Sequence, residues 1–192
     1  MNTRSLVGIF VSITVLVLSA CATIPPDKAA MIPDWDAPEE VISAANLSVI
    51  DVTGGAEPHS YSTMASDWSN RLSDDEFKEA LVEALRHSKI FTNVDTGAAH
   101  ENAYKLNAQI ISQPEVSPGF DMEVTLWVRY TLTDHTGHEV WAENIFSEYQ
   151  TKSEETFMGA KRMILTREGV VRNNFSQLLD KLSSVMKLEK GN

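Results

Sequence analysis

The stretch FDMEVTLWVRYTLTDHTGHEVWAENIFSEY, residues Phe120–Tyr149, decides the fold because its side chains alternate between two faces. A period of two is typical of a β-strand that buries one face. The tetrapeptide HTGH at 135–138 predicts a turn, and EVWAENIFSEY (139–149) predicts the antiparallel partner strand. One face of the first strand is apolar and comprises Phe120, Met122, Val124, Leu126, Val128, Tyr130 and Leu132.

Two helical segments flank the remaining strands. SDDEFKEALVEALRHSK (73–89) begins with a capping box of Ser73 and Glu76 and carries apolar residues at the spacing of one buried helix face. From about Ser153 to the C-terminus the apolar residues again follow a helical period, which Gly159 and Gly169 can interrupt or kink.

Three shorter apolar segments read as strands: 46–54, 90–95 and 103–111. The order of elements is therefore β-α-β-β-β-β-α. We expect an α+β domain in two layers, with two main helices packed on a four- to five-stranded antiparallel, or mixed, sheet.

The N-terminus has the three zones of a secretory signal. Arg4 supplies positive charge, residues 6–18 are mostly apolar, and Ser19 and Ala20 are small. Thirteen helical residues cover about 20 Å, less than the roughly 30 Å core of a bilayer. A cleaved signal therefore fits better than a transmembrane helix.

The sequence Leu18-Ser19-Ala20-Cys21 resembles the lipobox of bacterial lipoproteins. That resemblance implies a diacylglycerol on the Cys21 thiol, cleavage before Cys21 and an acylated new N-terminus. Such a chain is attached to a membrane through Cys21, because two or more acyl chains anchor stably. Ala22 follows the cysteine where Asp would resemble an inner-membrane retention signal, so the resemblance favours the periplasmic face of the outer membrane.

Three regions follow from these patterns: a signal peptide at 1–20, a lipidated N-terminus and tether at 21–45, and a single periplasmic domain at 46–188. The tether contains Pro25, Pro26, Pro33 and Pro38 among acidic residues, which predicts an extended spacer. Trp35 is its one aromatic residue, and we expect it to dock on the domain rather than lie at the membrane interface.

Composition excludes several classes of function. The net charge of −11 disfavours nucleic acid as a partner, and lipidation of Cys21, the only cysteine, leaves no thiol for disulfides, metal binding or catalysis. The chain has no G-x-S-x-G, Walker or H-E-x-x-H motif. We therefore expect no enzymatic activity, no cofactor and no metal, and interpret His135 and His138 as part of a polar turn.

The basic residues of KRMILTREGVVRNN (161–174) are either a solvated helix face or a stripe for an acidic partner. The candidate partner surface is Trp127, Arg129 and Trp141, which we expect on the sheet face opposite the apolar stripe. Two interpretations of that face stay open: it binds a partner, or the 55–70 loop covers it with Tyr61 and Trp68.

Residues 46–185 resemble small periplasmic domains of Gram-negative lipoproteins, with AYKLNAQI, VTLWVRYTLTDHTGHEVWAENIFSE and REGVVRNNFSQLLDKL as the supporting segments. The layout is nearest to the auxiliary lipoproteins of ABC-type lipid transport systems. That resemblance implies an accessory role in envelope assembly or lipid transport through contacts with another envelope protein. The alternatives are a carrier of lipid or another small ligand, and an activator of a peptidoglycan synthase.

Overall fold

The computed structural model describes residues 27–36, 38, 45–55, 72–96, 102–112, 121–156 and 159–191. Within these residues, no helix has the length and apolar character needed to cross a membrane. The signal peptide, Cys21 and Phe120 lie outside the described residues. The elements in chain order are the 3-10 helix η1 (Lys28–Met31), β1 (Asn46–Thr53), α1 (Asp74–Ser88), β2 (Asn93–Asp95), β3 (Tyr104–Ser112), β4 (Met122–Thr133), β5 (Glu139–Thr151) and α2 (Gly159–Gly191).

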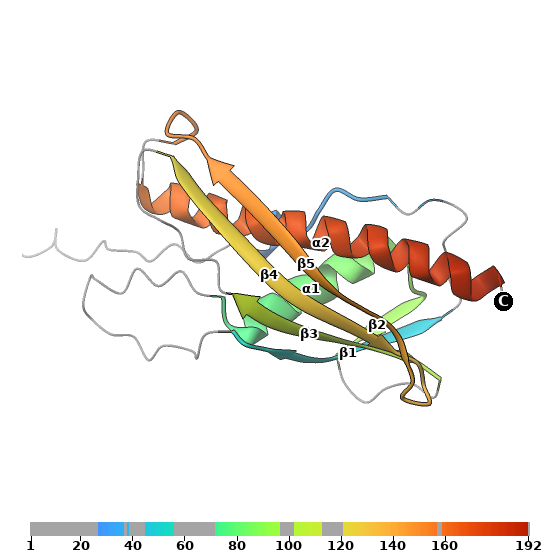
Figure 1. The fold of residues 1–192 in the computed structure, drawn as a ribbon. Coiled ribbons are helices and arrows are strands. Elements are labelled where there is room, and N and C mark those ends of the chain that lie inside the picture. The colour runs from blue at the N-terminus through green and yellow to red at the C-terminus, as the bar shows by residue number, and fades with distance from the viewer. Residues whose placement is uncertain are drawn as a thin grey trace, which may run out of the picture.

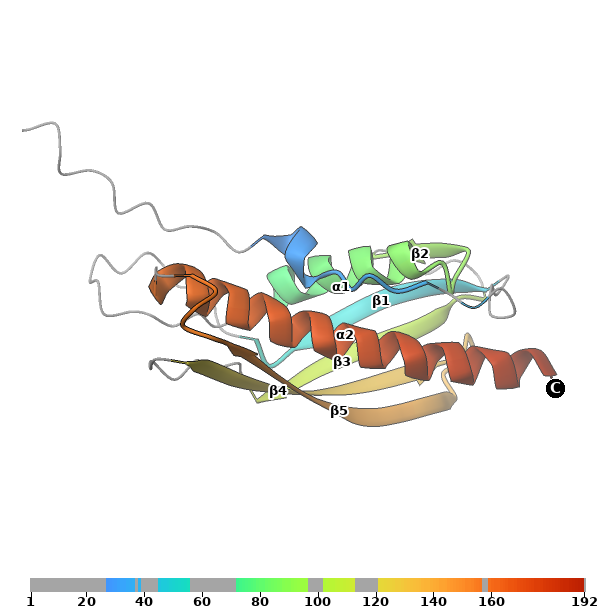
Figure 2. The ribbon, with the colours of Figure 1, turned by 90° about the horizontal axis from the view of Figure 1, so that it is seen from above.

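The five strands form one sheet in the order β2-β1-β3-β4-β5, and both helices cover the same face of it (Figures 1 and 2). The β3–β4 and β4–β5 pairs are antiparallel, and β4–β5 is the hairpin that the sequence predicts. β1, however, is parallel to both β2 and β3, so the sheet is mixed. The parallel pairing arises because α1 returns the chain from the end of β1 to its start.

α1 begins where its sequence signal predicts. The Ser73 hydroxyl accepts a hydrogen bond from the Glu76 N–H at 3.2 Å, and the Glu76 carboxylate accepts one from the Ser73 N–H at 3.2 Å. These two bonds satisfy backbone donors that a helix start otherwise leaves without partners. Lys89, with φ 56°, ends the helix in the left-handed conformation.

The core lies between the helices and the alternating face of β4. From Val124 to Leu132 every second side chain is at most 2% exposed. The two helices meet above this stripe, where Phe77 of α1 and Phe175 of α2 pack edge to face with ring centroids 5.1 Å apart. The buried face of β4 thus forms the sheet side of the core, and the two helices form the opposite side.

α2 runs through Gly169 without a break, which differs from the expected interruption. A Cβ atom at Gly169 would overlap the ring of Tyr149 on β5. The glycine is therefore present for close approach of helix and strand. The Tyr149 ring in turn lies 5.7 Å from the guanidinium carbon of Arg172, within reach of a cation–π contact.

Residues 27–36, which we call the strap, also differ from expectation. The expected spacer is extended and free, but Met31 is 0% exposed and Pro33 is buried. Trp35 does dock, as predicted: its ring packs against the core and its indole N–H donates to Asp180 at 2.8 Å. Apolar residues among the prolines and acids are what allow this segment to pack.

The contact between Gly169 and Tyr149 generates a test of the helix–sheet packing. Gly169→Ala should lower the free energy of unfolding by about 1–3 kcal/mol, because the methyl group displaces the ring. Gly159→Ala is the matched control, since a Cβ there meets nothing within 4 Å. Urea unfolding measures both. Equal stability of the two variants would contradict the packing.

Candidate functional site

The strands β1, β3, β4 and β5 each point half of their side chains away from the helices. We call the surface that these side chains form the open face of the sheet. Directly paired residues on neighbouring strands share a face, so the register arranges these side chains in rows. The rows are Asp51–Asn107–Thr131, then Thr53–Gln109–Arg129–Asn144, and then Trp127–Phe146.

Large apolar side chains gather at one end of the open face. Ile111 is 52% exposed, Trp127 42% and Phe146 38%, and we call these three residues the apolar shelf. The Trp127 and Phe146 rings are 5.0 Å apart at an angle of 54°. Ile111 lies at a register shift in the β3–β4 pairing, between Ile110, opposite Val128, and Ser112, opposite Trp127. Exposed apolar residues that cluster in this way mark interaction surfaces more often than scattered ones do.

A polar hollow adjoins the shelf. It has a volume of about 550 Å³ and is lined by Asp51, Thr53, Asn107, Ala108, Gln109, Arg129 and Thr131. Within the described part of the chain, no hydrogen bond or ion pair joins these polar side chains to one another. Asp51, Thr53, Asn107, Gln109 and Arg129 are exposed.

The structure places the three predicted partner-surface residues on different faces. Trp127 and Arg129 lie on the open face as expected. Trp141, in contrast, pairs with the buried Leu132 and packs against the core from the helix side of the sheet. The expectation for Trp141 is wrong because Trp127 pairs with Phe146, and that register turns the odd-numbered residues of β5 toward the helices.

Phe146 and Ile111 are the surface residues that sequence reasoning missed. Apolar and polar residues occur on both alternating sets of β5, so the sequence alone does not say which set faces outward. Ile111 follows the buried Ile110 directly, and only the irregular pairing near Ser112 shows that it is exposed. The 55–70 loop, with Tyr61 and Trp68, lies outside the described residues except for its first residue, Gly55.

The hairpin tip is a polar turn, as interpreted from its sequence. The Asp134 carboxylate accepts hydrogen bonds from the Thr136 hydroxyl at 2.6 Å and from the Thr136 and His138 N–H groups. The Thr136 hydroxyl is the main reason that the pKa of Asp134 is below its ordinary value. Across the described residues, no three His, Cys, Asp or Glu side chains gather as metal ligands do.

The basic segment at 161–174 is not one solvated face. Arg167 is 4% exposed, and burial lowers the pKa of its guanidinium. Arg172 donates to the Ala30 carbonyl at 2.8 Å. Arg167 is therefore buried and not part of a solvated stripe, and Arg172 ties residues 27–36 to α2.

Comparisons with known proteins identify the fold alone. No family model matches the sequence, and no curated protein matches it significantly. The crystal structure of protein XCC0632 from Xanthomonas campestris, a DUF330 protein, is similar with a TM-score of 0.64 and 11% identity, covering 87% of this chain and 97% of that one. Protein CT253 from Chlamydia trachomatis has a TM-score of 0.51 and 11% identity, covering 75% and 98%.

A minor lipoprotein from Acinetobacter baumannii is also similar, with a TM-score of 0.48 and 11% identity over 74% of this chain and 93% of that one. At that score the similarity supports no further argument. The chain thus shares an α+β fold with XCC0632 and CT253, and its function has to be argued from its own surface.

Proposed function

We propose that this chain is a lipoprotein anchored through Cys21 to the periplasmic face of the outer membrane. There it serves as a non-enzymatic accessory in envelope assembly or lipid transport, and it binds another envelope protein through the open face. The observation that carries the proposal is the apolar shelf of Ile111, Trp127 and Phe146 beside the polar hollow.

The composition of the open face is that of a protein-binding surface. Interface cores are enriched in aromatic residues and arginine, and such residues dominate binding energies. Trp127 and Phe146 provide an ordered aromatic pair, and Arg129 lies two residues along β4 on the same face. A partner that covered the shelf would remove three exposed apolar side chains from water. Hydrogen bonds to the polar residues of the hollow would fix the position of that partner on the open face.

The open face of the sheet is a better docking surface than the edge of β5. β5 is an outer strand, and an open edge can recruit a further strand. Here, however, α2 side chains occupy carbonyls of β5: Asn173 donates to Glu148 at 2.9 Å, and Gln177 donates to Phe146 at 2.9 Å. Lys181 adds an ion pair with Glu143. Covered edges resist strand addition.

The polar lining of the hollow favours contact with a protein over two other functions, which are carriage of a lipid or small ligand and catalysis. A carrier of acyl chains needs a concave, mostly apolar cavity. Catalysis needs a preorganised site from which water is excluded, whereas the hollow opens to solvent on a sheet face. Activation of a peptidoglycan synthase is the same mode of action with a different partner, so the identity of the captured protein decides between these roles.

Photo-crosslinking tests the docking surface. A benzoylphenylalanine at Thr125, on the open face, should give a discrete adduct in native envelopes, and the same group at Ser184, exposed on α2, should give none. Trp127→Ala should weaken the adduct about tenfold, as loss of a central aromatic anchor does. The variant should stay folded, with a stability loss of about 1 kcal/mol. Equal adducts from both positions would contradict the proposal.

The anchor has its own test. Cys21→Ser should abolish acylation, because only a thiol at this position receives the diacylglycerol, and the uncleaved precursor should accumulate. Mass spectrometry of the membrane fraction measures both effects. A Cys21→Ser chain that is still processed and acylated would show that the lipobox interpretation is wrong.

A further inference from the structure

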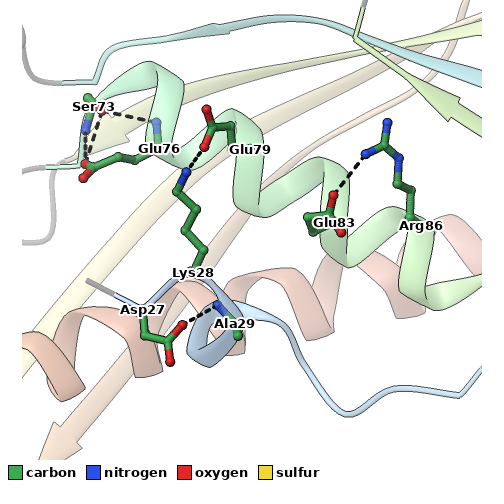
Figure 3. Close-up of polar contacts among 8 residues, drawn as sticks. All are labelled: Asp27, Lys28, Ala29, Ser73, Glu76, Glu79, Glu83 and Arg86. Atoms are coloured by element: carbon green, nitrogen blue, oxygen red, sulfur yellow. Dashed lines mark hydrogen bonds and ion pairs between the residues drawn. The ribbon is translucent and has the colours of Figure 1, made fainter. Parts of the chain in front are cut away.

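The strap lies between the two helices and contacts both (Figures 2 and 3). Asp27 caps η1 by accepting a hydrogen bond from the Ala29 N–H at 3.0 Å. Lys28 forms an ion pair with Glu79 of α1. Met31, which is 0% exposed, belongs to the core. The strap is thus a third element of the helical layer.

Three hydrogen bonds attach the strap to α2 in order along the helix. The Asp27 N–H donates to the Glu168 carboxylate at 2.7 Å, the Ala30 carbonyl accepts from Arg172 at 2.8 Å, and the Trp35 indole donates to Asp180 at 2.8 Å. Glu168 is only 3% exposed, and its burial raises the pKa of the carboxyl group. Release of the strap would remove a hydrogen-bond partner from that buried group, which is costly.

The direction of the strap fixes which end of the domain its first residue lies toward. Strap and α2 run the same way, so Asp27 is the strap residue that lies nearest the α2 start. Leu188 lies 20 residues beyond Glu168 along α2, which is about 30 Å at 1.5 Å per residue. Ion pairing of Lys181 with Glu143 shows that the hairpin tip lies toward that distant end too.

We infer that the strap holds one end of the domain against the phospholipid headgroups of the anchoring membrane, an inference that rests on the proposed acylation of Cys21. Six residue steps separate Cys21 from Asp27, and they span at most about 20 Å. A free spacer reaching to Asn46 would span about 85 Å. The surface apposed to lipid is therefore the α2 start and the 152–156 turn, and the open face stands to the side, accessible to a protein partner.

Energy transfer to the membrane tests this arrangement. The full chain, acylated in cells, carries a fluorophore on an unnatural amino acid at Glu154 or Leu188, both exposed. It is inserted into vesicles of phosphatidylethanolamine and phosphatidylglycerol with a headgroup acceptor. Transfer should be strong from position 154 and weak from 188. Equal transfer from the two positions would overturn the inference.

Two insertions separate a docked strap from a free spacer. A 12-residue Gly/Ser segment after Ala22 should about halve transfer from position 154, because it adds about 20 Å of root-mean-square reach. The same segment after Glu40 should leave transfer unchanged, because it follows the strap. Equal losses from both insertions, or no loss from either, would overturn the inference.

Failure of the proposed acylation gives a different result. A chain purified from cells would then lack acyl groups in its mass spectrum and would not float with vesicles. In that case the free Cys21 thiol is coupled to a maleimide lipid, and the two insertions are compared on the same vesicles. A pattern that depends on insertion position supports the docked strap, and equal effects contradict it.

Discussion

A buried hydrogen-bond network fixes the register on which both faces of the sheet depend. The Tyr130 hydroxyl on β4 donates to the Asn174 side chain of α2 at 2.7 Å, and the Asn174 amide donates to the Ile145 carbonyl and the Ser147 hydroxyl of β5 at 3.2 Å. Burial raises the pKa of Tyr130 well above its ordinary value, so this phenol stays a donor. A slip by one residue would leave these buried groups without partners and would exchange the two faces of the hairpin.

Much of this architecture can be predicted from the sequence, because local patterns specify it. The alternation from Met122 to Leu132, the turn at the hairpin tip and the Ser73–Glu76 capping box each act over a few residues, and each appears as predicted. The features that sequence reasoning missed depend on contacts across the chain. Trp141 lies on the helix side, against expectation, and Phe146 lies on the open face, because the β4–β5 register decides which residues of β5 point outward.

The packing of the strap is a second feature that depends on long-range contacts and that the sequence pattern does not predict. Proline and acidic residues around Met31 are typical of an extended spacer, and only the folded structure shows that Met31 and Pro33 are buried. The buried Glu168 supplies an acceptor for the Asp27 N–H, but it lies 141 residues along the chain. Such a long-range contact leaves no periodic signal in either segment.

Together these features give the sheet two faces with different roles. One face packs against the rest of the domain, and the other is exposed and can bind a partner. The helices and the strap cover the first, and the aromatic pair and the polar hollow occupy the second.

The central claim is that a partner covers the open face in the native envelope, and hydroxyl-radical footprinting tests it without any amino-acid substitution. Oxidation of Trp127 should fall in isolated envelopes relative to the purified chain, while oxidation of the docked Trp35 stays the same in both. Equal oxidation of Trp127 in envelopes and in solution would contradict the account.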